Sequence, residues 1–395
     1  MDRPVRIVHV GNYARAEVAG GVEVLSETLG AELGKQGTQN TLLSFSTHGA
    51  GAGLASQGFQ QELIPCRRKV FEVPLPTRAG RRLMRTRIAE ADVVHLYYPS
   101  PLGAYLGARM ARRAGKPYAV SVMSQIGIDE TSAHRGRIYK AAAWVVNRFL
   151  LRWTVQHADV VFSPSPGYIA ANRHIASHEA RAVLLPLGAD LERFRADLPR
   201  DHVRRKHGIE GPIVLFLGSL KATHRRKGLD VLMPAIAKLR EEGLQATLVI
   251  AADGELEHEF MALAQTLGIR DAVVHAKGVP RSEVPLYFAG ADIFVLASTW
   301  LEAFGLVLAE AMACGTPVIG STMGGIPYVI GDAGLVVPPG DVDALAAAIR
   351  RILTDKELAR ELSKRGRERV EEEFQWPKTA AVAKRALEGL AVQRP

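Results

Sequence analysis

Several features that mark other classes of protein are absent from this chain of 395 residues. It has only two cysteines, Cys66 and Cys314, which lie in opposite halves and are expected to be free thiols in a reducing cytoplasm. No apolar run reaches the roughly 18 residues of a transmembrane helix. The first ten residues, MDRPVRIVHV, lack the pattern of a signal peptide. These absences predict a cytoplasmic protein.

Familiar nucleotide and nucleic-acid motifs are missing as well. Neither G-x-G-x-x-G nor G-x-x-x-x-G-K-[ST] occurs, which argues against a dehydrogenase and a P-loop ATPase. No helix-turn-helix, zinc or aromatic-platform signature accompanies the arginines, so nucleic acid is not the expected partner.

The net charge of +9 is confined to the first half of the chain. Residues 1–190 carry 23 Lys and Arg against 14 Asp and Glu, whereas residues 191–395 carry 27 of each kind. A single basic run is often only a solvated face, but a one-sided surplus favours an anionic partner, such as an acidic membrane surface or a lipid diphosphate. The basic residues fall into three groups: Arg67 to Lys69; Arg78, Arg81, Arg82, Arg85 and Arg87; and Arg109, Arg112, Arg113 and Lys116.

Short apolar runs alternate with helical patterns, stop at a charged stretch over residues 191–211, and then resume. Nearly continuous apolar runs are typical of strands buried on both faces, so the alternation predicts two parallel, doubly wound α/β sheets. Two Rossmann-like domains, 1–195 and 205–374, should face a cleft at the carboxyl ends of their strands. The glycine-rich segment 49–58 is predicted to be a mobile loop. The predicted strands are 5–10, 41–45, 92–97, 118–123, 159–164, 182–186, 212–218, 246–251, 272–278, 292–297 and 317–320.

The most informative stretch is STWLEAFGLVLAEAMACGTP, residues 298–317. A strand leads into a turn that carries Glu302 and Gly305, and the helix that follows contains Glu310. The free N–H groups of the first helical turn form a natural anion site, and carboxylates beside it can accept hydrogen bonds from hydroxyls. Two glutamates at this spacing also occur by chance, but phosphate and hydroxyl recognition together indicate a sugar nucleotide.

Further signals follow the first strand of each half. In LFLGSLKATHRRKGLD, Gly218 ends a strand and Lys227 opens a helix, so Arg225, Arg226 and Lys227 could stabilise a leaving diphosphate. The alternative is a solvated basic loop. Gly20 and Gly21 open the first helix and would permit close approach of a phosphate, although a Gly-Gly turn is more often only a loop.

The chain resembles the retaining glycosyltransferases of family 4, which have the GT-B fold. EAFGLVLAEAMACGTPVI is similar to the paired-glutamate signature of that family, and the other motifs occur in the order and spacing of the family. The resemblance implies that a C-terminal helix, 377–395, crosses back to the first domain. The other motifs are GGVE, DVVHLY, PLGADLERF, KGLDVL, ADGELE, GGIPYVI and FQWPK.

The resemblance also implies roles for individual residues. Glu302 would contact the donor hexose at the reacting carbon, Glu310 would hold the ribose hydroxyls, and Lys227 would neutralise the diphosphate, with Arg226 assisting. Backbone amides of Phe304, Gly305 and Leu306 would bind the diphosphate or hexose. Other donor-side residues would be Gly20, Gly21, Gly218, Ser219, Arg225, Asp253 and Gly254, with residues 277–280 near the base; Glu23, His95, Met123 and Ser124 would lie on the acceptor side.

Two positions depart from the family pattern. Ser219 stands where the family usually has Arg, so Arg225 or Arg226 would supply the cation instead. Met123 stands where many members have His, and Ser124 follows it. His95 or another residue could replace that imidazole, although His95 is also interpretable as an ordinary polar strand residue.

We therefore expect a retaining hexosyltransferase that uses a UDP- or GDP-linked sugar, a glycan or lipid-linked acceptor, and no metal or other cofactor. It would act in polysaccharide biosynthesis, in the cytoplasm or at the inner face of the membrane. Two alternatives are another GT-B enzyme, such as an epimerase or phosphorylase, and a non-catalytic protein that binds nucleotide sugars.

Overall fold

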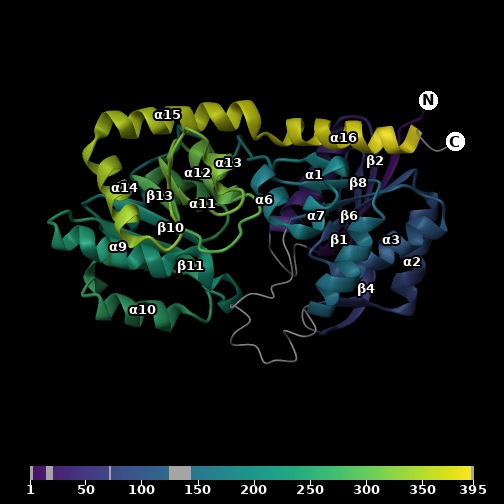
Figure 1. The fold of residues 1–395 in the computed structure, drawn as a ribbon, viewed down its shortest axis with the longest axis horizontal. Coiled ribbons are helices and arrows are strands. Elements are labelled where there is room, and N and C mark those ends of the chain that lie inside the picture. Colours follow the sequence, from purple (N-terminus) through teal and green to yellow (C-terminus); the bar gives the residue numbers. More distant parts are fainter. Residues whose placement is uncertain (1–2, 15–20, 71–72, 124–143, 393–395) are drawn as a thin grey trace. The chain divides into compact units, whose positions relative to one another are not determined.

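The computed structural model describes residues 3–14, 21–70, 73–123 and 144–392, and Figure 1 shows its ribbon. The chain forms two compact units. The first comprises Met1–Leu187 and Trp376–Pro395, and the second comprises Gly188–Gln375. Each has its own sheet and its own core.

The sheet of the first unit has the strand order β3-β4-β2-β1-β6-β7-β8-β9, with β5 also paired to β4. Most neighbours are parallel, as predicted, but β3 and β5 run antiparallel to β4. The prediction of a loop over 49–58 is wrong, because backbone hydrogen bonding to β4 holds residues 51–56 as an exposed strand despite their glycines. The strands are β1 (Arg6–Tyr13), β2 (Gln39–Ser46), β3 (Gly51–Ser56), β4 (Phe59–Val70), β5 (Val73–Pro76), β6 (Val93–Tyr98), β7 (Tyr118–Val122), β8 (Val160–Ser163) and β9 (Ala182–Leu184).

Helices pack on this sheet, and one of them comes from the far end of the chain. The last helix, α16, contacts α1 and β6, which confirms the predicted return to the first domain. Two hydrogen bonds anchor its start: Thr379 Oγ1 donates to Pro186 O at 2.8 Å, and Gln36 Nε2 donates to Pro377 O at 2.8 Å. The helices are α1 (Gly21–Lys35), α2 (Arg78–Glu90), α3 (Pro101–Arg113), η2 (Val146–Leu151), α5 (Arg152–Gln156), α6 (Pro166–Ala171), α7 (Arg173–Ala176), η3 (Glu179–Arg181) and α16 (Trp376–Val392).

The sheet of the second unit is parallel throughout, with the order β12-β11-β10-β13-β14-β15. This is the strand order of a Rossmann-type sheet, and it confirms the predicted class. The strands are β10 (Ile213–Ser219), β11 (Thr247–Asp253), β12 (Val273–Ala276), β13 (Ile293–Leu296), β14 (Val318–Ser321) and β15 (Leu335–Val337).

Helices of the second unit pack on that sheet, and α9 and α14 share one core cluster with its strands. Leu232 and Ile236 of α9 and Leu345 and Ile349 of α14 are fully buried against it, because each helix repeats its apolar residues at helical spacing. Among the described residues, no helix is long and apolar enough to cross a bilayer. The helices are α8 (His202–His207), η4 (Ala222–Lys227), α9 (Leu229–Glu241), α10 (Glu257–Thr266), η5 (Arg270–Ala272), α11 (Val284–Gly290), α12 (Leu306–Ala313), α13 (Ile326–Ile330), α14 (Val342–Thr354) and α15 (Lys356–Glu373).

Candidate active site

An ion pair between Lys227 and Glu302 lies at the topological switch point of the second sheet. β11 and β12 extend the sheet on one side of β10, whereas β13, β14 and β15 extend it on the other, so the loops after β10 and β13 diverge there. Lys227 follows β10 and Glu302 follows β13, and Lys227 Nζ donates to Glu302 Oε2 at 2.6 Å. The side chains are 29% and 19% exposed, which leaves both within reach of a ligand. Open α/β sheets bind ligands at this position.

Two glycines let the backbones of these loops approach closely. Gly228 has φ 87°, and a Cβ there would lie 2.0 Å from the carbonyl oxygen of Ala297, at the end of β13. Gly324 has φ 59°, and a Cβ there would lie 2.2 Å from Glu302 O, which also accepts from Gly325 N at 2.7 Å. Both positions favour glycine, because their φ is positive and because a Cβ would collide with the neighbouring backbone. The loops are therefore fixed around the ion pair.

The start of α12 follows Glu302 directly. Gly305 is the N-cap residue with φ 91°, and Leu306 begins the helix. Phe304 is buried, and its ring meets that of Phe374 edge to face at 5.3 Å between centroids. The first N–H groups of a helix have no acceptor within the helix, so this turn can bind an anion. The packing of Phe304 holds the turn in place for that role.

Glu310 lies farther along the same helix, in a different environment from Glu302. Burial raises the pKa of Glu310 to about 7. The positive charges of Arg193 and Arg281 act in the opposite direction and lower this pKa, whereas the negative charge of Asp190 raises it further. Arg193 and Asp190 belong to the PLGADLERF motif, for whose residues no individual role was predicted. A carboxylate beside arginines can accept hydrogen bonds from a diol.

The ends of β10 and β11 place a second set of predicted residues together. Ser219 pairs with Asp253 in the parallel register, so Gly218 and Gly254 flank adjacent strand ends. Asp253 accepts from Gly278 N at 3.1 Å through both carboxylate oxygens. The segment predicted to lie near the nucleobase therefore adjoins Asp253.

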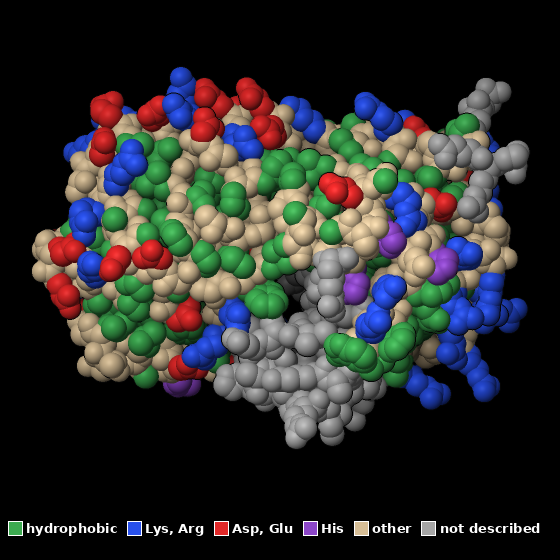
Figure 2. Space-filling model, in the orientation of Figure 1, with side chains coloured by type: hydrophobic (Ala, Val, Ile, Leu, Met, Phe, Trp, Pro, Cys, Tyr) green, Lys and Arg blue, Asp and Glu red, His purple; other side chains and the backbone are tan. Residues whose placement is uncertain are grey.

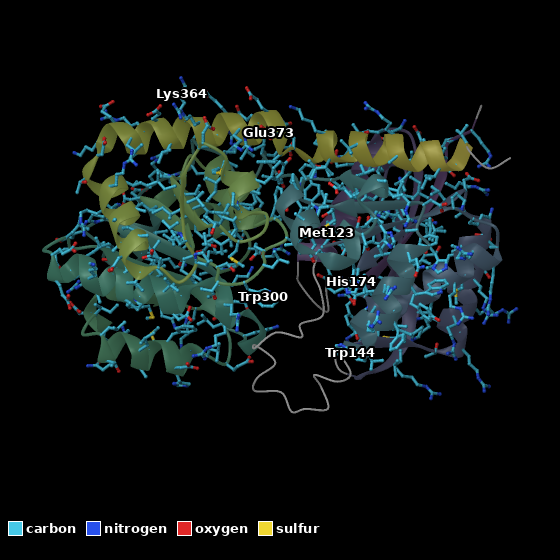
Figure 3. All side chains as sticks on the ribbon, viewed as in Figure 1. Met123, Trp144, His174, Trp300, Lys364 and Glu373 are labelled. Atoms are coloured by element: carbon cyan, nitrogen blue, oxygen red, sulfur yellow. The ribbon has the colours of Figure 1, made fainter. Side chains whose placement is uncertain are left out.

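The two arginines before Lys227 have different partners. Arg225 Nη1 donates to Glu259 Oε2 of α10 at 2.6 Å. The guanidinium of Arg226 lies 5.2 Å from the ring centroid of Trp300, which is 43% exposed at the edge of the second unit (Figure 3). Sequence reasoning gave Trp300 no role, although it lies two residues before Glu302. Among the described residues, no group of three or more His, Cys, Asp and Glu could hold a metal.

The predicted residues of the first unit fall into two environments. Gly21 begins α1, and the buried Glu23 accepts from Asn12 Nδ2 at 2.8 Å near the carboxyl end of β1. Burial raises the pKa of Glu23. This contact ties the first turn of α1 to the end of β1. Gly20 and Ser124 lie outside the described residues.

His95 and Met123 are both buried. His95 lies on β6 with no exposed surface, its Nε2 is 2.7 Å from Ser121 Oγ, and burial, together with His9, lowers its pKa well below the ordinary value. A ligand reaches such an imidazole only if the core opens. This burial therefore favours the alternative that His95 is an ordinary polar residue of the strand. Met123 is 7% exposed at the end of β7, at the edge of the first unit (Figure 3).

Comparison with known proteins gives consistent matches. The models of Glycosyltransferase Family 4 and of Glycosyl transferases group 1 match residues 19–193 and 199–369. The GDP-mannose-dependent alpha-(1-6)-phosphatidylinositol monomannoside mannosyltransferase of Mycolicibacterium smegmatis is 30% identical over 331 residues, 80% of this chain and 81% of the relative. Its counterpart of the same name in Mycobacterium tuberculosis is 31% identical over 319 residues, 78% of this chain and 79% of the relative. Sucrose-phosphate synthase from Thermosynechococcus elongatus superimposes with a TM-score of 0.77 at 25% identity, covering 98% of this chain and 99% of that chain.

The two Rossmann-like units and these matches define a glycosyltransferase with the GT-B fold. The chain belongs to glycosyltransferase family 4. Its second half matches the model of the glycosyl transferases group 1. The resemblance seen in the sequence is thereby confirmed, and the individual roles of the site residues stay predictions.

Proposed function

We propose that this protein is a retaining hexosyltransferase that moves a hexose from a nucleoside diphosphate sugar to a hydroxyl of a glycan or glycolipid. The observation that carries the proposal is the Lys227–Glu302 pair at the switch point, beside the start of α12. Fixed positive charge and helix N–H groups suit a diphosphate, and a carboxylate suits the hexose hydroxyls. Both kinds of group occur in one place.

The proposed reaction exchanges one glycosidic bond for another on the same face of the sugar. The bond from the anomeric carbon to the diphosphate breaks, and the acceptor oxygen forms the new bond to that carbon. The proton of the acceptor passes to the leaving phosphate. Lys227, with Arg226 beside it, stabilises the charge that develops on the diphosphate, and Glu302 holds the hexose in position.

The relatives suggest which donor to test first. The mannosyltransferases that are 30% and 31% identical are named as GDP-mannose-dependent, and their acceptor is a phosphatidylinositol monomannoside. We therefore propose GDP-mannose as the first candidate donor, with UDP-linked hexoses second, and a mannosylated glycolipid as the first acceptor. We also propose that no metal is needed, which retention of activity in EDTA would support.

The test compares Glu302→Gln and Lys227→Met in a transfer assay and in calorimetric titration with the nucleoside diphosphate. Glu302→Gln should lower transfer at least tenfold, because it loses on the order of one charge-assisted hydrogen bond to the hexose. The same variant should bind the nucleoside diphosphate normally. Lys227→Met should weaken nucleoside diphosphate binding by about tenfold or more. Lys238→Met, whose partner is Asp343 on the exposed surface, is the matched control and should behave as wild type.

Each alternative has a distinct outcome. Near-normal transfer by Glu302→Gln would remove Glu302 from the mechanism. Release of free sugar without an acceptor, or dependence on phosphate, would favour another GT-B reaction. Tight binding of a nucleotide sugar without turnover on any acceptor would favour the non-catalytic protein.

A further inference from the structure

Three neighbouring helical segments of the first unit carry most of its net positive charge. α3 contacts α2, η2 and α5. Together α2, α3 and residues 144–156 contain ten arginines and one carboxylate, Glu90, which pairs with Arg87 at 2.9 Å. Every one of these arginines except Arg87 is exposed. The surplus seen in the sequence is thus gathered on one group of helices.

The arginines of α2 form a stripe along one face of the helix. Arg78, Arg81, Arg82 and Arg85 follow the spacing of residues that share a helix face, and they line an open hollow of about 670 Å³. The opposite face, with Gly80, Met84 and Ile88, is buried, so the stripe faces outward. Within the described part of the chain, none of these four guanidinium groups pairs with a carboxylate. Four unneutralised cations in a row suit a surface with many anions.

Large apolar side chains are exposed on the segment that begins at Trp144, which continues into η2, a neighbour of α3. Trp144 is 47% exposed and Phe149 is 59% exposed, and their rings meet edge to face at 6.4 Å between centroids. Val145, 47% exposed, adds to the same patch. In Figure 2 a hydrophobic group lies at the position that Figure 3 labels Trp144, on the same face of the molecule as a group of Lys and Arg side chains. Exposed aromatic groups of this size usually mark an interaction site.

We propose that this surface, the arginine–aromatic face (Arg78, Arg81, Arg82, Arg85, Trp144 and Phe149), docks on a lipid bilayer that contains acidic lipids. Arginines attract the headgroups, and aromatic rings are stable at the boundary between headgroups and acyl chains. Nucleic acid would use the charge but would leave Phe149 and Val145 exposed to water. The mixture of charge and apolar side chains therefore favours a membrane.

This inference goes beyond the proposed transfer reaction, and it does not depend on it. Docking would hold the protein at a membrane, where lipid-linked acceptors are concentrated. Vesicle binding is measured without donor or acceptor, so failure of docking and failure of the proposed transfer are separate results.

The experiment is co-sedimentation of the full chain with vesicles of phosphatidylcholine, with and without a third of phosphatidylglycerol. Wild-type protein should pellet with acidic vesicles, pellet less as salt rises, and stay in solution with neutral ones. Arg81→Glu/Arg85→Glu should bind more than tenfold more weakly, since each basic residue contributes roughly fivefold. Lys356→Glu/Arg385→Glu changes the net charge equally at exposed positions of α15 and α16 and should bind as wild type.

A second pair of variants tests the aromatic half of the face. Trp144→Ser/Phe149→Ser should bind acidic vesicles several-fold more weakly, whereas Leu54→Ser/Val382→Ser removes exposed apolar groups elsewhere and should not. Circular dichroism confirms that each variant folds. Equal pelleting with neutral and acidic vesicles, or equal binding by the two charge variants, would overturn the proposal. Preferential binding of RNA over acidic vesicles would also overturn it and assign the face to nucleic acid.

Discussion

The two glutamates of the family signature differ in their surroundings. Glu302 is neutralised by Lys227 at 2.6 Å, whereas Glu310 lies where burial raises its pKa to about 7. A group with that pKa is partly protonated at neutral pH, so its capacity to accept hydrogen bonds changes in the working range of the protein.

This difference predicts a pH dependence of donor binding. Glu310 should lose its proton as the pH rises through about 7, and the carboxylate should then bind the ribose hydroxyls more strongly. Affinity for the intact nucleotide sugar should therefore increase between pH 6 and pH 8, by about three- to tenfold for one improved hydrogen bond. Calorimetric titration checks this, and the intact nucleotide sugar avoids the terminal phosphate of a free diphosphate, which itself titrates near pH 6.

Glu310→Gln is the matching variant, because it keeps the shape and removes the ionisation. It should bind more weakly at pH 8 and show little change in affinity between pH 6 and pH 8. An unchanged pH dependence in this variant would show that another group titrates.

At the scale of the elements, turns rather than helices decide where the side chains of the site lie. Gly228 brings the loop after β10 against the end of β13, and Gly324 brings the loop after β14 against Glu302. Each permits a backbone approach that a Cβ would prevent. The packing of Phe304 on Phe374 holds the start of α12 from the other side.

Replacing one glycine tests how strictly this turn holds Glu302. Gly324→Ala would place a Cβ 2.2 Å from Glu302 O, so the loop must move, and transfer should fall at least tenfold. Gly340→Ala is the matched control, since its φ of 78° is also positive but nothing lies within 4 Å of the new Cβ. The control should lose only about 1 kcal/mol of stability and keep its activity. Equal losses of activity in both variants would mean that backbone strain, and not the contact with Glu302, is responsible.

At the scale of the whole molecule, each unit has its own core and one buried cysteine. Cys66 lies in the first unit and Cys314 in the second, and they are 8% and 0% exposed. Burial raises the pKa of Cys314 to about 12, so this thiol is unreactive while the second unit stays folded. Each thiol therefore reports the opening of its own unit.

Thiol labelling should show that the nucleotide stabilises the second unit. With a nucleoside diphosphate at about 100 times its dissociation constant, opening of the binding unit becomes about 100-fold rarer, so labelling of Cys314 should slow by up to that factor. Labelling of Cys66 should change much less. Mass spectrometry of Cys66→Ser and Cys314→Ser measures the two rates separately. Stronger protection of Cys66 than of Cys314 would place the nucleotide on the first unit.

Local patterns in the sequence were sufficient for much of the fold. Continuous apolar runs and their alternation with helical patterns determined most strands of both sheets, because these strands are largely buried and each carries its own signal. The ordered motifs determined the family, which the comparisons confirm. The exceptions are β4, β5 and β15, which were not among the predicted strands, β3, whose glycines suggested a loop, and α2, whose arginine-rich segment was not predicted to be a helix.

Tertiary structure decided what depends on distant residues meeting. Lys227 and Glu302 are 75 positions apart, and only the strand order brings their loops together. The burial of His95, the pairing of Arg225 with Glu259, and the exposure of Trp144 likewise follow from packing between elements. A sequence fixes which residue types are available and how they repeat, whereas contact, burial and pKa depend on neighbours that the chain supplies only after it folds.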